Sequence, residues 1–197
     1  MKILLTGFGP FADVAENPSA AVVGRLSGSC LGGADVVGVV LPVEFAASVR
    51  ALSEAIAEVR PAVLLCLGVA RGRSRIEVET VARGGVSKSL DSGGEAGPMV
   101  GSVERRVATI DVAGLVSQLV AGGFDAVASE DAGGYVCDHV FFHAIDTARE
   151  FGAAAGFVHL PDPAGEAGGN WTVDRLTAAV AEAVAWLAEE GGDALLA

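Results

Sequence analysis

Apolar and polar positions follow two different periods in this sequence, and segments with one period alternate along the chain with segments that have the other. Short apolar runs that are typical of buried strands recur between stretches with an apolar residue every three or four positions, which are typical of helices facing a core. The expected strands are 2–6, 35–40, 62–67, 75–81, 125–129 and 154–160, and the expected helices are 17–28, 44–59, 113–121, 136–151 and 172–190. This alternation predicts an α/β fold, a three-layer α/β/α sandwich with a mostly parallel twisted sheet.

Two of these elements carry further detail. The first helix should begin at Asn17, which can cap the N–H groups of a first turn, and Pro18 fits the first helical position. The strand expected at 75–81 alternates, so Glu77 and Glu79 should lie together on the face opposite its apolar residues.

Composition narrows the class of protein. The chain has 197 residues, 51% of them apolar, and no internal repeat, so we expect a single domain over 1–197. Its formal charge of −12 would repel a phosphate backbone, which argues against nucleic acid as a partner. The first apolar run is too short for a signal peptide and no other is long enough to span a membrane, so we expect a cytoplasmic protein without a membrane partner. The cysteines have neither the number nor the spacing of a disulfide framework or a zinc site, so reduced thiols are expected.

A glycine-rich turn follows the first expected strand. Residues Gly7 to Ala12 fit the G-x-G-x-x-A pattern of dinucleotide-binding proteins, so a nucleotide-dependent enzyme is one alternative. That fingerprint requires a helix that begins inside the turn, whereas the helix here is expected only from Asn17. Phe8 and Phe11 would crowd a pyrophosphate; they could instead line a small apolar pocket or be ordinary core residues.

Cys137 is the candidate nucleophile. It follows the strand at 125–129 after two glycines and should lie near the first turn of the next helix, where N–H groups and the helix dipole stabilise a thiolate and can receive an oxyanion. The alternative is a buried, inert cysteine. Cys30, in a Gly/Ser turn, and Cys66, inside an apolar strand, are interpreted as inert.

Three histidines are available as the base. His139 and His143 lie four residues apart on the helix that carries Cys137, so they share one face and should point away from the thiol, and we interpret them as solvent-exposed. As a zinc pair they lack a third ligand of suitable spacing. His159 lies at the end of the next strand. Neighbouring strand ends place their side chains together in such a sheet, so His159 is expected beside the thiol, the alternative being a partly buried structural histidine.

A carboxylate is needed to orient the imidazole in this kind of covalent catalysis. Glu79 lies among apolar residues, where a charge demands a partner, and a histidine is a suitable one. Glu77 competes for the same role, and a solvated strand face would explain both. Spacing alone does not separate them.

Several segments together resemble the pyroglutamyl-peptidase I (pyrrolidone-carboxylate peptidase) family of cysteine peptidases. The matching motifs are Thr6-Gly7-Phe8-Gly9-Pro10-Phe11 with Asn17-Pro18-Ser19, Gly72-Arg73-Ser74 with Ile76-Glu77-Val78-Glu79, Ala132-Gly133-Gly134-Tyr135-Val136-Cys137, and Gly156-Phe157-Val158-His159-Leu160-Pro161. The resemblance implies that Cys137 is the nucleophile and His159 the base. It also implies that Glu79, rather than Glu77, is the third catalytic residue.

The resemblance also implies an activity. Such a protein hydrolyses the bond after an N-terminal pyroglutamyl residue without metal or other cofactor, and many members are homotetramers. Pyroglutamyl peptides would be the substrates, bound in a small pocket by Phe8, Phe11, Asn17 and Val136. The alternative is a protein on the same scaffold that binds pyroglutamyl ligands without cleaving them.

The sequence departs from the family pattern in two places. Glu130, Asp131 and Asp138 stand where Asn, Ser or Thr is expected, and their negative charge should oppose a thiolate at Cys137. The stretch 84–101 has glycine and serine in place of the family's Asn and Arg and shows no apolar period, so we expect a long, exposed and mobile loop of the kind that covers active sites.

Overall fold

The computed structural model describes residues 1–11, 16–84, 90–97, 104–163 and 169–194. The strands in these ranges are β1 (Lys2–Phe8), β2 (Cys30–Leu31), β3 (Ala34–Leu41), β4 (Val63–Ala70), β5 (Ile76–Glu79), β6 (Val81–Gly84), β7 (Glu104–Val107), β8 (Ala126–Ser129) and β9 (Ala154–Pro161). The helices are α1 (Pro18–Leu26), α2 (Phe45–Val59), α3 (Val112–Ala121), α4 (Val136–Glu150) and α5 (Val173–Ala194).

Seven strands form one sheet in the order β2-β3-β1-β4-β9-β5-β8. β1 pairs in parallel with β3 and β4, and β4 pairs in parallel with β9. β5 runs antiparallel to β9, β8 runs parallel to β5, and the short edge strand β2 runs antiparallel to β3. The sheet is therefore mostly parallel, with β5 and β8 reversed at one side.

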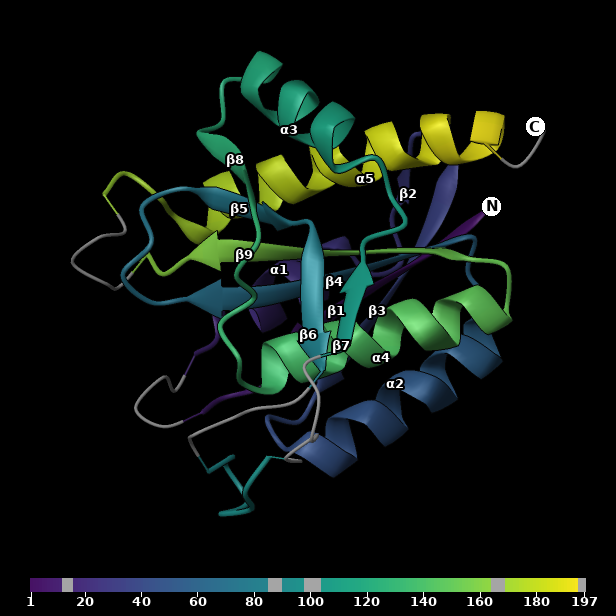
Figure 1. The fold of residues 1–197 in the computed structure, drawn as a ribbon. Helices are drawn as coiled ribbons and strands as arrows, with labels where there is room; N and C mark the ends of the chain where they lie inside the picture. Colours follow the sequence, from purple (N-terminus) through teal and green to yellow (C-terminus); the bar gives the residue numbers. More distant parts are fainter. Residues whose placement is uncertain (12–15, 85–89, 98–103, 164–168, 195–197) are drawn as a thin grey trace.

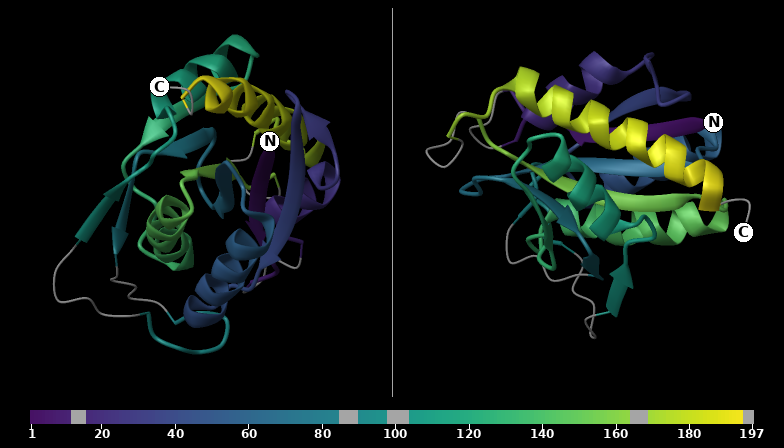
Figure 2. Two further views of the ribbon diagram at one scale, coloured as in Figure 1. Left: turned by 90° about the vertical axis from the view of Figure 1, so that its right-hand side faces the viewer. Right: turned by 90° about the horizontal axis from the view of Figure 1, so that it is seen from above.

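Helices cover both faces of this sheet. α2 and α4 lie on one face, and α1, α3 and α5 lie on the other (Figures 1 and 2). The central strands β1 and β4 are apolar almost throughout because both of their faces are buried. The predicted three-layer α/β/α sandwich is confirmed. No helix in the described ranges combines the length and the apolar character needed to cross a bilayer.

The reversal of β5 and β8 changes how the chain reaches α4. Ser129 ends β8 level with Glu79 of β5, which in turn pairs with Phe157, before the end of β9. The carboxyl ends of β8 and β9 therefore do not meet, and our reason for expecting Cys137 beside His159 was wrong. The segment 130–135 instead carries the chain from β8 across to the start of α4 (Figure 1).

The strand expected at 75–81 is divided between two sheets. β5 ends at Glu79 in the large sheet, and after Thr80 the chain continues as β6, which pairs antiparallel with β7 in a separate two-stranded sheet. The apolar alternation continues from one strand into the next, so it does not mark the division.

The loop expected at 84–101 is described only in part. Gly84 ends β6, 90–97 forms an exposed turn, and the remainder lies outside the described residues. The turn is anchored at its base, because the buried carboxylate of Asp91 accepts the N–H of Phe45, at the start of α2, at 2.9 Å. This part of the segment is therefore exposed, as expected, but fastened to a helix.

Candidate active site

Cys137 is the second residue of α4 and follows a sharp turn. Gly133 and Gly134 have φ angles of 87° and 63°, in the left-handed region that glycine enters without strain. Tyr135 precedes the helix and makes no capping side-chain hydrogen bond. The thiol is thus held at a helix start whose first N–H groups are not capped by the side chain of the preceding residue.

The sulfur of Cys137 lies over Gly68 of β4. A β carbon built on Gly68 would be 3.0 Å from this sulfur and 2.9 Å from the ring of Phe157. Gly68 is the register partner of His159, and register partners in neighbouring strands direct their side chains to the same face of a sheet. The thiol, which lies over β4, and the His159 imidazole, which projects from β9, therefore lie on the same face of the sheet, and these two strands are about 4.8 Å apart.

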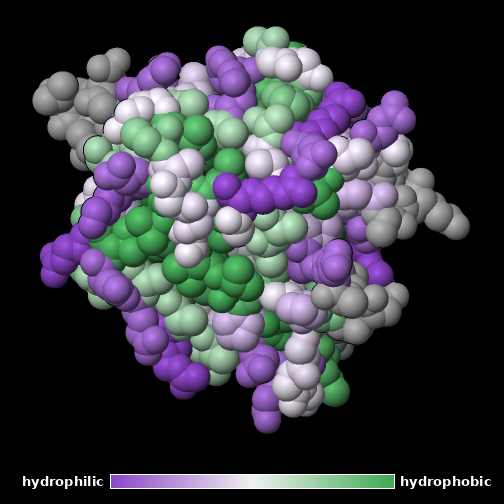
Figure 3. All heavy atoms as spheres, turned by 180° about the vertical axis from the view of Figure 1, so that it is seen from behind, coloured by the Kyte–Doolittle hydropathy of each residue, from purple (hydrophilic) through white to green (hydrophobic). Residues whose placement is uncertain are grey.

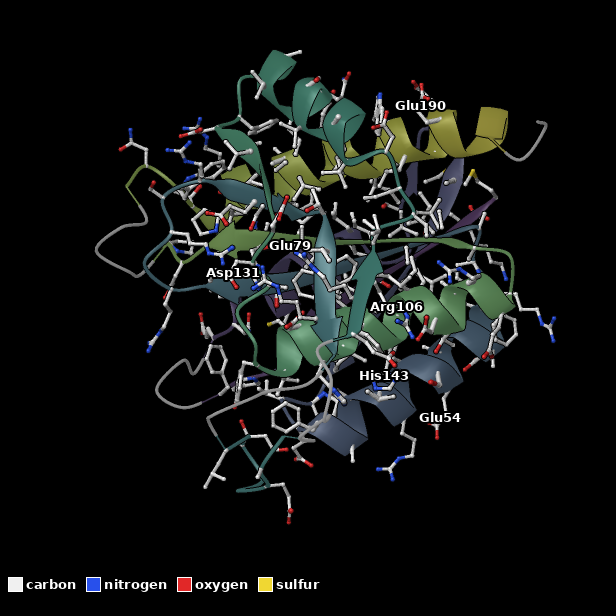
Figure 4. All side chains as sticks on the ribbon, viewed as in Figure 1. Glu54, Glu79, Arg106, Asp131, His143 and Glu190 are labelled. Carbon is white, nitrogen blue, oxygen red and sulfur yellow. The ribbon has the colours of Figure 1, made fainter. Side chains whose placement is uncertain are left out.

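His159 and Glu79 form a buried pair. The imidazole Nδ1 lies 2.7 Å from the Glu79 Oε1, and the two side chains are only 4% and 0% exposed. Glu79 reaches this contact from β5, the strand beside β9 (Figure 4). Because Nδ1 is engaged by the carboxylate, Nε2 is the ring nitrogen that remains available to the thiol.

Arg73 joins this cluster from the segment that precedes β5. Its Nη1 lies 2.9 Å from the same Oε1 of Glu79 and also contacts Glu77, while its Nη2 donates to the carbonyl of Asp131 at 2.6 Å. Glu77 is thus paired with the guanidinium. Of the two glutamates that spacing left open, Glu79 is the one whose carboxylate contacts the imidazole of His159.

Glu79 is held as an anion although it is buried. Burial raises the pKa of its carboxyl group, but the hydrogen bond and charge of His159, together with Ser129 and Arg73, outweigh burial, and the net pKa lies below the ordinary value. Ser129 is the register partner of Glu79 on β8, and Oε2 of Glu79 has no hydrogen-bond partner among the described residues.

Cys137, in contrast, is held as a neutral thiol. Its residue is half-buried but its sulfur is enclosed, and burial, followed by the charges of Asp138 and Glu79, raises the pKa of the thiol to about 12. The positive charge of Arg73 lowers the pKa of the thiol, but by less than these causes raise it. The thiol therefore needs a base in order to react at neutral pH.

The three acidic residues near the thiol differ in their surroundings. Asp138 is buried, burial raises its pKa to about 6, and its Oδ1 accepts the backbone N–H of Arg83 at 2.7 Å. Glu130 and Asp131 are exposed, and their carboxylates lie 3.6 Å from Arg105 and 4.0 Å from Arg83. The expected opposition to a thiolate acts chiefly through Asp138, the leading charge that raises the pKa of the thiol.

A cavity of about 60 Å³ lies beside the thiol. It is lined by Phe8, Phe11, Asn17, Val43, Val69, Tyr135, Val136 and Cys137. The structure thus brings together with the thiol all four residues that the resemblance implies for substrate binding, namely Phe8, Phe11, Asn17 and Val136. The other lining residues, Val43, Val69 and Tyr135, carry no sequence pattern that separates a pocket wall from a core position.

The glycine turn after β1 packs against α1. A β carbon on Gly7 would be 2.7 Å from the carbonyl oxygen of Ser19, so the helix start approaches the turn too closely for a larger residue. Asn17 caps α1 as predicted, accepting the N–H of Ser19 at 3.1 Å, and its Nδ2 donates to the carbonyl of Gly9 at 2.9 Å. The protein's own side chain therefore occupies the helix start where the nucleotide alternative requires a phosphate; Ala12 of that pattern lies outside the described residues.

The other two cysteines differ in their burial. Cys66 is buried in β4, where burial raises the pKa of its thiol to about 12, as expected of an inert cysteine. Cys30 is exposed, but it lies in β2, paired with Asp35 of β3, and not in a turn as expected. The Gly/Ser-rich stretch provides both a short edge strand and its turn.

The remaining histidines are half-buried, which corrects the expectation of solvent exposure. The rings of His139 and His143 contact each other with centroids 4.6 Å apart, and His139 also contacts Phe45 of α2. Burial lowers the pKa of both, that of His139 to about 4. This side of α4 packs against α2. Within the described ranges no group of three His, Cys, Asp or Glu side chains is placed to hold a metal ion.

Gly68 and Arg73 contact the site without having been candidates from the sequence. Arg73 stands in the motif before Glu79, and its signal was a cation four and six positions from two glutamates. Gly68 lies near the end of an apolar run, where a glycine indicates a close approach by another group.

Comparison with known proteins places this geometry in a family. The sequence model of the pyroglutamyl peptidase family matches residues 1–170. The pyrrolidone-carboxylate peptidase of Halalkalibacterium halodurans is 39% identical over 171 residues, which cover 81% of this chain and 83% of that protein. The corresponding protein of Gloeobacter violaceus is 37% identical over 169 residues, covering 82% of each.

Solved structures agree with the sequence comparison. Pyroglutamyl peptidase I from Bacillus amyloliquefaciens has a TM-score of 0.89 at 29% identity and covers 96% of this chain and 98% of its own. A mutant pyrrolidone carboxyl peptidase from Pyrococcus furiosus has a TM-score of 0.89 at 26% identity, covering 97% and 100%. The resemblance drawn from the motifs is confirmed, and the chain belongs to the pyroglutamyl peptidase family.

Proposed function

We propose that the protein is a cysteine peptidase of the pyroglutamyl-peptidase I type, which hydrolyses the bond after an N-terminal pyroglutamyl residue. In this proposal Cys137 is the nucleophile, His159 the base and Glu79 the residue that orients the base. The observation that carries the proposal is the buried 2.7 Å contact between His159 and Glu79, on the sheet face where the Cys137 sulfur lines a small aromatic cavity.

The proposed reaction has two halves. The His159 imidazole takes the proton of the Cys137 thiol as the sulfur attacks the carbonyl carbon that links pyroglutamate to the next residue. The oxygen of that carbonyl becomes negative, and the N–H groups at the start of α4 are suited to receive it. His159 then gives its proton to the leaving amine, and a thioester remains. Water, deprotonated by His159, attacks the thioester, so pyroglutamate leaves and the thiol is restored.

The raised pKa of the thiol fits concerted proton transfer. A thiol with a pKa of about 12 is almost entirely protonated at neutral pH, so the base must act during the attack. The ionised Glu79 carboxylate supports this role, because it fixes the ring orientation and stabilises the imidazolium that forms.

The cavity suits a neutral lactam ring. Phe8 and Phe11 supply aromatic walls, and Val43 and Val69 supply aliphatic ones. An N-terminal glutamine or proline would not present the same N–H and C=O groups to the few polar atoms of such a pocket.

A chromogenic pyroglutamyl amide provides the direct test. The wild type should release the chromophore, iodoacetamide should stop the release, and Cys137→Ala should abolish it. Cys30→Ala is the matched control, since this exposed thiol on β2 should be dispensable. Binding of the amide without release, together with slow labelling of Cys137, would instead identify the non-catalytic ligand-binding protein.

We further infer a cytoplasmic homo-oligomer, a tetramer as in many members of the family. Three unpaired cysteines fit a reducing compartment. β2 pairs with only the first two residues of β3, and Val40 further along β3 is 48% exposed. Apolar side chains gather in the middle of the molecular face on this side (Figure 3).

Light scattering tests this inference and should give a multiple of the chain mass. Val40→Glu should reduce the measured mass, whereas Val120→Glu on α3 should not. A wild-type monomer would contradict the inference.

A further inference from the structure

We propose that Arg73 is a positioning residue of the reaction: it holds the Glu79 carboxylate as an anion aimed at His159 and fastens it to the segment that leads to Cys137. This inference rests on the catalytic assignment above and adds a residue that the assignment does not contain. Two independent sets of contacts carry it.

The first set of contacts converges on one oxygen. Oε1 of Glu79 accepts from Arg73 Nη1 at 2.9 Å and contacts His159 Nδ1 at 2.7 Å, whereas Oε2 has no hydrogen-bond partner among the described residues. The carboxylate is therefore oriented by two donors on a single oxygen. If the guanidinium is removed, the imidazole is the one donor of this pair that remains, and the Glu79 carboxylate gains freedom to rotate.

The surroundings of Glu79 make a cation necessary. The titratable and charged groups that face it are His159 from β9, Glu77 from β5, Cys137 and Asp138 from α4, and Arg73. Three of these groups are or become anionic. Arg73 contacts both glutamates through Nη1, so its charge offsets their mutual repulsion at the point where they meet.

The second contact reaches across the site. Arg73 Nη2 donates to the carbonyl oxygen of Asp131 at 2.6 Å. Asp131 belongs to the segment 130–135, which must cross from the reversed strand β8 to the start of α4 because the ends of β8 and β9 do not meet. One guanidinium thus connects the carboxylate that orients the base with the chain segment that sets the position of the nucleophile.

Mutation can separate two properties of Arg73, its positive charge and the planar, several-donor geometry of its guanidinium group. Arg73→Gln removes both, and Arg73→Lys keeps the charge but cannot span Glu79 and Asp131 in the same way. Loss of the charge raises the pKa of Glu79, because Arg73 lowers that pKa, and Glu79 must be ionised to orient His159. The acid limb of the pH profile of kcat/KM should therefore move to higher pH in Arg73→Gln.

The experiment measures kcat, KM and the pH profile with a chromogenic pyroglutamyl amide. Arg73→Gln should lose at least about tenfold in kcat, with KM little changed and the acid limb at higher pH. Arg73→Lys should lower kcat but leave the acid limb at its wild-type pH. Arg75→Gln is the matched control for charge, since Arg75 is exposed two residues away and should leave kcat and the limb unchanged.

Three outcomes would overturn the inference: a wild-type kcat and profile in Arg73→Gln, a loss that is equal at every pH and parallels a lower melting temperature, or the same limb shift in Arg75→Gln. If Arg73→Gln does not fold, Arg73→Lys decides, and an unchanged kcat or a shifted limb then counts against the inference. Absence of turnover by the wild type would instead reject the proposed function itself.

Discussion

The sulfur of Cys137 occupies the space that a side chain on Gly68 would need, with only 3.0 Å between the sulfur and the β-carbon position. Gly68→Ala should therefore displace the thiol, because the new methyl group also meets the ring of Phe157 at 2.9 Å and cannot move aside. We expect kcat/KM for a pyroglutamyl amide to fall by at least about tenfold, with a stability loss of about 1–3 kcal/mol from overpacking.

Gly24→Ala is the control for that substitution. Gly24 lies in α1, and no described residue comes within 4 Å of its β-carbon position, so alanine should leave activity unchanged and stabilise the helix by about 0.5–1 kcal/mol. Full activity in Gly68→Ala would show that the sulfur does not need its present position.

Glu79→Gln and Glu77→Gln should differ sharply. The amide of Glu79→Gln cannot stabilise the imidazolium or fix the tautomer of His159, so kcat should fall by about 10²- to 10⁴-fold. Glu77→Gln should keep most of the activity, because Glu77 contacts Arg73 and not the imidazole. Steady-state kinetics at several pH values decide the matter, and the reverse order of the two losses would reassign the orienting carboxylate.

Asp138→Asn should make the thiol more reactive. The charge of Asp138 is the largest contribution after burial to the raised pKa of Cys137, and asparagine removes that charge while its oxygen still accepts the N–H of Arg83. The rate of alkylation by iodoacetamide at pH 7 should rise several-fold. Asp131→Asn serves as the control, because Asp131 is exposed and should change the rate far less. Equal rates in wild type and Asp138→Asn would contradict the electrostatic account.

The same aspartate should make stability depend on pH. Its folded pKa of about 6 lies above that of an exposed aspartate, about 4, so ionisation in the folded state opposes folding. This destabilisation is absent below about pH 4 and complete above about pH 6. The difference in unfolding free energy between Asp138→Asn and wild type should therefore grow in favour of the variant over that interval; a constant difference would count against the raised pKa.

Asn17→Ala should weaken both the fold and the pocket. The substitution removes the cap of α1 and the hydrogen bond to the carbonyl of Gly9, which together should lower the free energy of unfolding by about 1–3 kcal/mol. KM should also rise, since Asn17 lines the cavity. Asp111→Ala, which removes the cap of α3, should lower stability in urea denaturation without changing KM. Equal KM effects in both variants would deny Asn17 a role in the pocket.

Local chemistry was readable from the sequence where one residue decides the outcome. Asn17 and Pro18 fix the start of α1 because capping and proline geometry act within a single turn. The apolar runs of β1 and β4 indicate burial on both faces for a similarly local reason. The position of Cys137 at a helix start followed from the glycines before it.

The direction of each strand and the strand with which it pairs could not be predicted from the sequence in the same way. An apolar period is the same for a strand in either direction, so nothing in residues 125–129 announces that β8 runs against β9. The division at Thr80 between two sheets leaves the alternation intact. The role of Arg73 depends on residues as distant as Asp131, and the half-burial of His139 depends on α2, so both required the tertiary arrangement.

The place of β9 in the sheet links the proposed chemistry to the order of synthesis. β9 is the last strand of the described chain, yet it pairs between β4 and β5 in the interior of the sheet. A nascent chain that ends before residue 154 therefore exposes two strand edges that normally bind β9, and such open edges favour aggregation. It also lacks His159, so the Cys137 thiol stays without its proposed base until β9 inserts. The proposed activity therefore cannot arise before β9 has been synthesised and has inserted between β4 and β5.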